Sequence, residues 1–198
     1  MPSLTFPVLP GPTSLAKDLL AKAEIAYGPR DQQWQFAGVT PVNGGPLILY
    51  PNVRVAMIGV SVEPTSDTNQ LMFQLAHEVI HLLSPNNAQS DATMIEEGTA
   101  VKFSLHGPDY PWADYSNLAR SGLSHPNSEN YKYALELLEE LETTHPSAIR
   151  RLRETEPHFY LWTPEFLVAE LGITSDFAER LCSRKAMRPR EPLAVMFS

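Results

Sequence analysis

Residues 77–81 read His77-Glu78-Val79-Ile80-His81, and this stretch fixes both the expected fold and the expected site. On a helix, residues four apart lie on the same face with Cβ atoms about 5–6 Å apart, so the two imidazoles can share one metal ion. Glu78 points to the flank of the pair, where its carboxylate can reach a water on the metal without becoming a ligand. The stretch therefore predicts a helix that holds a metal ion.

The spacing H-E-x-x-H is typical of zinc hydrolases. A catalytic zinc takes three protein ligands and leaves a fourth position for water, so two histidines require a third donor from elsewhere in the chain. We therefore expect one zinc ion per chain, bound by His77, His81 and one further residue.

A second motif follows in the sequence Ile95-Glu96-Glu97-Gly98-Thr99-Ala100. It resembles the second signature of the gluzincin metallopeptidases, in which an E-G-x-A run on a second helix supplies a glutamate ligand. The resemblance covers residues 77–103 and implies that Glu97 is the third metal ligand. The residues alone leave alternatives, because Glu97 could be an acid that stabilises a helix N-terminus while Glu96 or Asp91 binds the metal.

The resemblance implies a zinc-dependent metallopeptidase. In such a site the zinc lowers the pKa of its bound water to about 7, and Glu78 acts as the general base that passes the proton to the leaving nitrogen. The spacing Glu97, Ala100, Phe103 is also similar to the small zinc peptidases that work beside phage-type repressors, and the G-x-M-x-N anchor of the aminopeptidases is missing. We expect an endopeptidase of limited specificity. The alternative is a catalytically weak or inactive metallopeptidase-like module for binding or regulation, against which the intact Glu78 argues.

The oxyanion of the transition state also needs a hydrogen-bond donor opposite the metal. In the aminopeptidase branch of the gluzincins this donor is a tyrosine in the pattern Y-x-x-G-A-x-x-L. Residues 131–138 read Tyr131-Lys132-Tyr133-Ala134-Leu135-Glu136-Leu137-Leu138, which is similar but has alanine in place of glycine and lies closer to Glu97. The resemblance implies Tyr131 as the donor. The other candidates are Tyr133, His125, His158 and Tyr160.

Composition is consistent with a soluble enzyme, and the resemblance implies a peptide or protein substrate. The 198 residues are 43% hydrophobic and 19% charged, as in ordinary globular proteins. The net charge of −8 argues against nucleic-acid binding, and no stretch approaches the roughly 20 apolar residues that span a bilayer. A single cysteine, Cys182, excludes an internal disulfide, and the first residues do not read as a signal peptide. We expect a cytoplasmic protein without a membrane partner; the oligomeric state is not predicted.

The pattern of apolar and turn residues predicts an α+β fold in a single domain, 1–198. A small N-terminal antiparallel or mixed sheet should pack on a mainly helical zincin-like metallopeptidase core, with an irregular lead-in at 1–12 and an irregular tail at 186–198. In the gluzincins a sheet edge pairs with the substrate, and residues 53–60 are the candidate for that edge. The alternative is that these residues form a fully paired central strand. Expected strands are 33–37, 47–50 and 54–62, with turns at 43–46 and 51–52. Expected helices are 15–25 (capped by Thr13 or Ser14), one carrying His77 and His81 (capped by Ser66, Asp67 or Thr68), one carrying Glu97, and then 114–121, 128–144, 146–155, 163–171 and 174–185.

Overall fold

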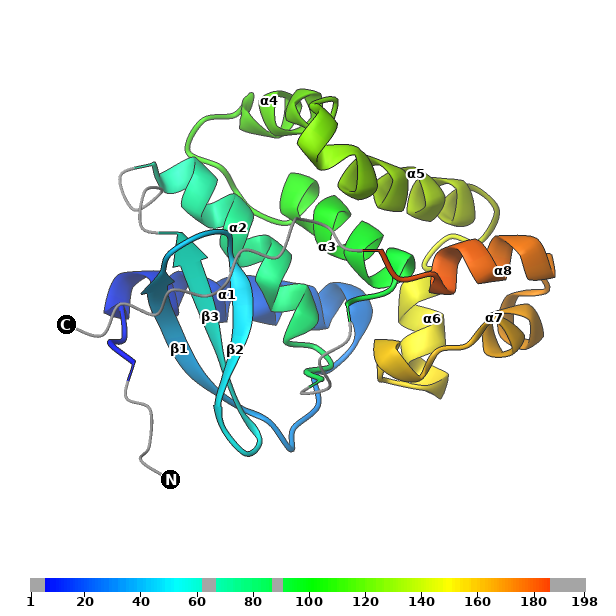
Figure 1. Cartoon of the computed structure of the whole chain (residues 1–198), viewed down its shortest axis with the longest axis horizontal. Coiled ribbons are helices and arrows are strands. Elements are labelled where there is room, and N and C mark those ends of the chain that lie inside the picture. Colours follow the sequence, from blue (N-terminus) through cyan, green and yellow to red (C-terminus); the bar gives the residue numbers. More distant parts are fainter. Residues whose placement is uncertain (1–5, 62–66, 87–90, 186–198) are drawn as a thin grey trace.

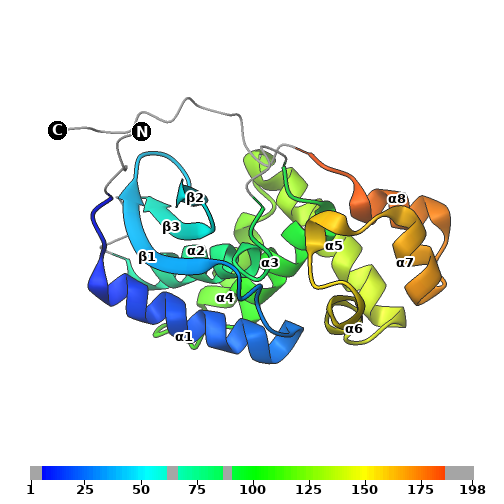
Figure 2. The ribbon, with the colours of Figure 1, turned by 90° about the horizontal axis from the view of Figure 1, so that it is seen from below.

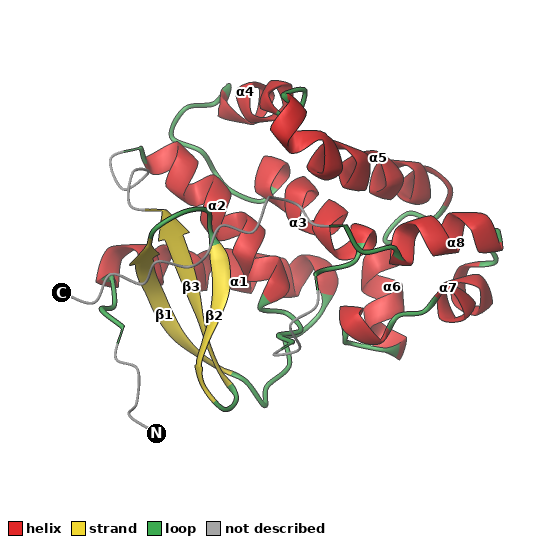
Figure 3. Cartoon of the chain, viewed as in Figure 1, coloured by secondary structure: helices red, strands yellow, loops and turns green. Residues whose placement is uncertain are grey.

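The computed structural model describes residues 6–61, 67–86 and 91–185, and it confirms the α+β class (Figures 1 and 3). A helix begins the described chain, three strands follow, and the rest is helical. None of the described helices has the length and apolar character needed to cross a membrane. The elements are α1 (Pro10–Tyr27), β1 (Gln35–Val42), β2 (Leu47–Asn52), β3 (Val55–Ser61), α2 (Thr68–His81), α3 (Met94–His106), α4 (Tyr115–Gly122), the short 3₁₀ helix η2 (Pro126–Ser128), α5 (Glu129–Thr144), α6 (Ala148–Thr155), the 3₁₀ helix η3 (Phe159–Leu161), α7 (Pro164–Leu171) and α8 (Ser175–Cys182).

The sheet is mixed, with the strand order β1-β3-β2. β3 pairs in parallel with β1 and antiparallel with β2, so it is the central strand. Of the two alternatives for residues 53–60, the structure shows the fully paired central strand, and the candidate substrate-binding edge is wrong. Residues 56–60 are buried without a break, which is the pattern of a strand covered on both faces rather than of a half-exposed edge. Within the described sheet, the edges are β1 and β2.

The hairpin between β2 and β3 turns at Val53 and Arg54, because β2 continues through Asn52. The expected turn at 51–52 is thus displaced by two residues. Arg54 has φ 55°, in the left-handed region that glycine and asparagine enter most easily. The turn between β1 and β2 falls within 43–46, as predicted.

The N-terminal segment is more ordered than the sequence predicted. α1 begins at Pro10, with prolines in its first turn where a missing N–H costs nothing, so the lead-in expected at 1–12 is wrong for residues 10–12. Thr13 does not cap this helix; its hydroxyl accepts the Val39 N–H at 2.9 Å, and the Leu9 N–H donates to the Val39 carbonyl at 2.8 Å. Residues 1–5 and the tail expected at 186–198 lie outside the described residues.

Helices α1 and α2 lie against the same face of the sheet, and Figure 2 shows α1 running below the strands. α1 contributes a buried stripe of Ala16, Leu19, Leu20 and Ala23, spaced by three or four residues as one helix face requires. α2 in turn packs against α3, and α3 packs against α5. The two central helices, α2 and α3, are therefore covered from both sides.

Gly98 sets the distance between α3 and α5. A Cβ at this position would lie far inside van der Waals contact of the Ala134 carbonyl oxygen on α5, and close to the Leu138 side chain. Only glycine therefore allows the two helices to approach as closely as they do.

We expect Gly98→Ala to destabilise the fold by about 3 kcal/mol, because the clash involves backbone that cannot rotate away. Urea unfolding followed by circular dichroism measures the effect. Gly122→Ala is the matched control, since nothing lies within 4 Å of a Cβ there and the residue also belongs to a helix. If Gly98→Ala unfolded at the wild-type urea concentration, the close packing of α3 on α5 would be incorrect.

A buried arginine joins the end of α1 to the C-terminal helices. Arg153 on α6 is 4% exposed, and its guanidinium donates to the carbonyl oxygens of Tyr27 at 3.0 Å, Pro29 at 2.6 Å and Pro157 at 2.7 Å. The same group lies 5.2 Å from the centre of the Phe159 ring. Its hydrogen-bonding capacity is thus used on backbone, which fixes the segment after α6 relative to the N-terminal helix.

Candidate metal centre

Helix α2 brings the two histidines together, as the motif predicted. Asp67 caps the helix, with its carboxylate accepting the N–H groups of Asn69 and Gln70. The helix is buried along residues 74–80, which includes His77, and the His81 side chain at its end is 15% exposed. The Nε2 atoms of His77 and His81 lie 3.3 Å apart.

Helix α3 brings a carboxylate to the same point. Thr93 caps α3 by accepting the Glu96 N–H at 3.4 Å, which places Glu97 in the first turn. One Glu97 carboxylate oxygen lies 3.2 Å from the His77 Nε2, and the other lies 3.8 Å from the His81 Nε2. Ligand atoms of the three residues all lie within 4.8 Å of one another, which is the arrangement that a single metal ion needs.

The donors and their surroundings fit a divalent cation. His81 Nδ1 lies 2.8 Å from a Glu96 oxygen, and a metal-binding histidine commonly makes this bond to a carboxylate, leaving Nε2 for the metal. Burial alone lowers the pKa of His81, but the hydrogen bond with Glu96 and the charges of Glu97, Glu96 and Glu78 outweigh it and raise this pKa to about 10. The site therefore stabilises positive charge strongly. Two imidazoles and a carboxylate are donors that zinc accepts.

A cavity of about 300 Å³ opens onto these three residues. Glu78 lines it and is 4% exposed, so its carboxylate is held in the wall beside the three candidate ligands. Tyr131 lines it too, from the first turn of α5, with its ring centre 5.6 Å from that of His77. The structure thus places every residue of the predicted site around one hollow.

The two alternative ligands, Glu96 and Asp91, do not join the two histidines in the candidate metal group. Among the described residues, the group that could hold a metal consists of His77, His81 and Glu97. Glu96 is adjacent but bonds to the opposite ring nitrogen of His81. Asp91 lines the cavity without joining that group.

Of the alternative oxyanion donors, one lines the cavity and three do not. Tyr160 lines the cavity together with Tyr131. Tyr133 instead carries the Lys185 ammonium over its ring at 4.4 Å. His125 accepts the Asn127 N–H at the start of η2. His158 lies between the carboxylates of Asp31 and Glu156 and lines a neighbouring hollow.

The cavity has one wall that the motifs did not predict. Strand β2 supplies Leu47, Ile48 and Tyr50. The Tyr50 hydroxyl accepts the Asn86 N–H at 3.1 Å, and burial, the largest influence on this group, raises the pKa of Tyr50 to about 12. No local signal in the sequence marks these residues, because their place depends on the order of strands in the sheet.

Comparisons with protein-family models, with curated protein sequences and with solved structures found no match to this chain. The chemistry of the site therefore rests on the residues and their geometry.

Proposed function

We propose that this protein is a zinc-dependent metallopeptidase of the gluzincin type, with a zincin-like core, that hydrolyses peptide bonds. The observation that carries the proposal is the convergence of His77, His81 and Glu97 within 4.8 Å on a cavity that Glu78 also lines. Three protein ligands beside an open cavity suit a catalytic metal, whereas a structural zinc is closed by four.

When bound, a zinc ion would supply Lewis acidity and lower the pKa of a water molecule to about 7. Glu78 accepts the proton of the attacking water and delivers it to the leaving nitrogen of the peptide. Glu96 holds the imidazole of His81 in the tautomer that presents Nε2 to the metal position. The Tyr131 hydroxyl donates to the oxygen that becomes negative as the carbonyl is attacked.

We assign the substrate-binding edge of the sheet to strand β2 instead of residues 53–60. It is an edge strand of the described sheet and it lines the cavity through Leu47 and Ile48. An extended peptide can add to such an edge through backbone hydrogen bonds, which would lay its scissile bond across the metal position. This supports an endopeptidase that binds an extended segment of peptide or protein.

The test of the proposal is metal content together with hydrolysis. Purified wild-type protein is expected to hold one zinc per chain by elemental analysis and to cleave peptides from a proteome-derived mixture. His81→Ala should lose metal and activity together, because it removes one of three ligands. His125→Ala is the matched control, since that exposed histidine belongs to no metal group. Full zinc retention in His81→Ala, or a zinc-loaded protein that cleaves nothing, would contradict the proposal.

A further inference from the structure

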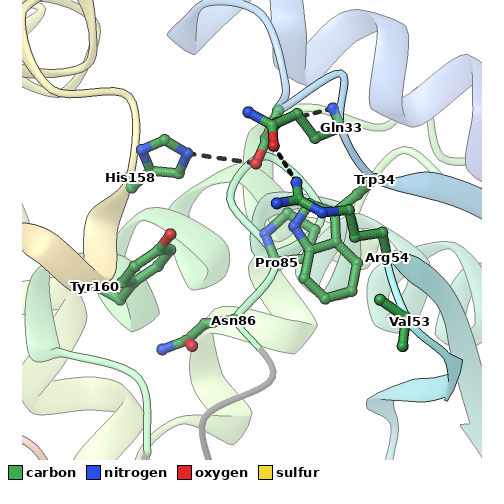
Figure 4. A pocket seen from close by; sticks show the side chains of 9 residues that line it. Gln33, Trp34, Val53, Arg54, Pro85, Asn86, His158 and Tyr160 are labelled. Carbon is green, nitrogen blue, oxygen red and sulfur yellow. Dashed lines mark hydrogen bonds and ion pairs between the residues drawn. The ribbon is translucent and has the colours of Figure 1, made fainter.

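A second hollow of about 360 Å³ lies beside the metal cavity, and Asn86 and Tyr160 line both. Figure 4 shows Trp34, Val53 and Arg54 on one side of it and His158 and Tyr160 on the other. The two hollows are therefore neighbours with a shared wall. A peptide bound over the metal position would therefore have a side chain close to this second hollow.

The acidic group of this hollow is already engaged. Asp31 accepts the Gln33 N–H at 2.9 Å through one oxygen, and its other oxygen lies 3.4 Å from the His158 Nε2. Its side chain is 11% exposed. His158 in turn has its Nδ1 2.8 Å from Glu156. Both carboxylates on this side thus contact His158, and each also accepts a backbone N–H.

Arg54 is a cationic residue that lines this hollow, and the group that its guanidinium contacts is a neutral amide. Its guanidinium donates to the side-chain carbonyl of Gln33, as the dashed line in Figure 4 marks. No ion pair joins Arg54 to a carboxylate among the described residues, although its planar group suits a carboxylate better than an amide.

The backbone at Arg54 is a second, independent observation. Its φ of 55° suits glycine or asparagine at the β2–β3 turn, and a larger residue is strained there. Strained residues persist where the surrounding structure holds them, and they are concentrated at functional sites. The arginine is thus presented at the rim of the hollow at a conformational cost.

We propose that this hollow binds a carboxylate of the substrate peptide, with the Arg54 guanidinium as the recognising group. The walls suit the apolar stem of such a residue, because Trp34 and Tyr160 offer ring surface. Burial, together with Asp31 and Glu156, raises the pKa of Tyr160, so its hydroxyl stays protonated and able to donate. The substrate class, an acidic peptide, rests on the proposed function; the carboxylate site does not.

The binding test uses full-length, zinc-loaded Glu78→Gln protein and three peptides. Acetyl-Ala-Glu-Ala-amide carries an acidic side chain, acetyl-Ala-Gln-Ala with a free carboxyl end carries a terminal carboxylate, and acetyl-Ala-Gln-Ala-amide is uncharged. Titration is followed by nuclear magnetic resonance at the Trp34 indole N–H, which is assigned with Trp34→Phe. One of the two acidic peptides should bind about 5- to 10-fold more tightly than the uncharged one, as expected for one charge-assisted contact that is partly exposed. Which of the two does so identifies the source of the carboxylate.

Arg54→Gly should abolish this preference. Folding is not at risk, because glycine suits φ 55° and the melting temperature should stay level or rise. Arg150→Gln, an exposed charge change on α6, is the control that keeps the preference. Arg54→Lys should retain part of it. Equal binding of all three peptides would overturn the inference, as would a preference that survives Arg54→Gly, which would put the carboxylate on the metal.

Hydrolysis separates this inference from the proposed function. Cleavage sites are compared between wild type and Arg54→Gly in the same peptide mixture. If wild type cleaves nothing while acidic peptides bind through Arg54, the peptidase proposal fails and the carboxylate site stands. If cleavage occurs with the same sequence preference in both proteins, the carboxylate site fails and the peptidase proposal stands.

Discussion

Glu78→Gln is expected to lower peptide hydrolysis by about 10²-fold or more while leaving zinc content at the wild-type level. Glutamine keeps the size and shape of the side chain but cannot accept the proton of the attacking water. The residue is buried in the cavity wall and is not one of the three candidate ligands found among the described residues, so metal binding should survive. The measurement is the rate of product formation on a peptide identified from the wild-type digest, with elemental analysis of the same samples.

The matched control for this change is Glu136→Gln, an exposed residue on α5 whose ion pair with Lys132 lies on the surface. It should leave the hydrolysis rate unchanged, which shows that a lost negative charge alone is not the cause. If Glu78→Gln cleaved a confirmed substrate at the wild-type rate, general-base catalysis by this residue would be ruled out.

Tyr131→Phe should lower kcat by about 10²- to 10³-fold with little change in KM. A hydrogen bond to the oxyanion forms fully only in the transition state, so its loss affects turnover rather than substrate binding. The tyrosine ring lies edge-on to His77, with ring centres 5.6 Å apart, which keeps the side chain at the metal cavity. Steady-state kinetics on the same peptide gives both constants.

Tyr133→Phe is the comparison variant, because this residue is two positions along the same helix and its ring is covered by the Lys185 ammonium. Its kcat should match that of wild type. An unchanged kcat in Tyr131→Phe would leave Tyr160, the other tyrosine of the cavity outside β2, as the donor to be tested next.

The site was predictable from sequence to the extent that it depends on local geometry. His77 and His81 face the same way because a helix repeats every 3.6 residues, and Glu97 follows from the second motif on the next helix. The order of the strands was not predictable, because pairing is decided by contacts between distant segments. The continuous burial of residues 56–60 was visible as an apolar run, yet the sequence alone did not show which strands would flank it.

Contacts between distant segments also explain the residues that the sequence did not predict. Tyr50 and Arg54 reach the two hollows only because β2 and its turn lie beside the loop that follows α2. Thr13 was expected to cap a helix but bonds to the Val39 backbone, so a tertiary contact replaced a local one. Predicting such tertiary contacts requires knowledge of which segments lie together in the folded chain.

The buried guanidinium of Arg153 has a consequence for charge neutrality at the centre of the molecule. Glu78, Glu96 and Glu97 carry three negative charges when ionised, while neutral imidazoles carry none. Burial lowers the pKa of Arg153 to about 10, with Glu96 acting in the opposite direction, so this group remains cationic at neutral pH. When both imidazoles are neutral, as metal binding requires, one positive charge against three negative ones leaves an imbalance of two, which is the valence of a divalent ion. Without a metal, His81, whose pKa is raised to about 10, is itself cationic and offsets one of the two. The interior would be nearly electroneutral with such an ion in place, and a monovalent ion would leave it one charge short.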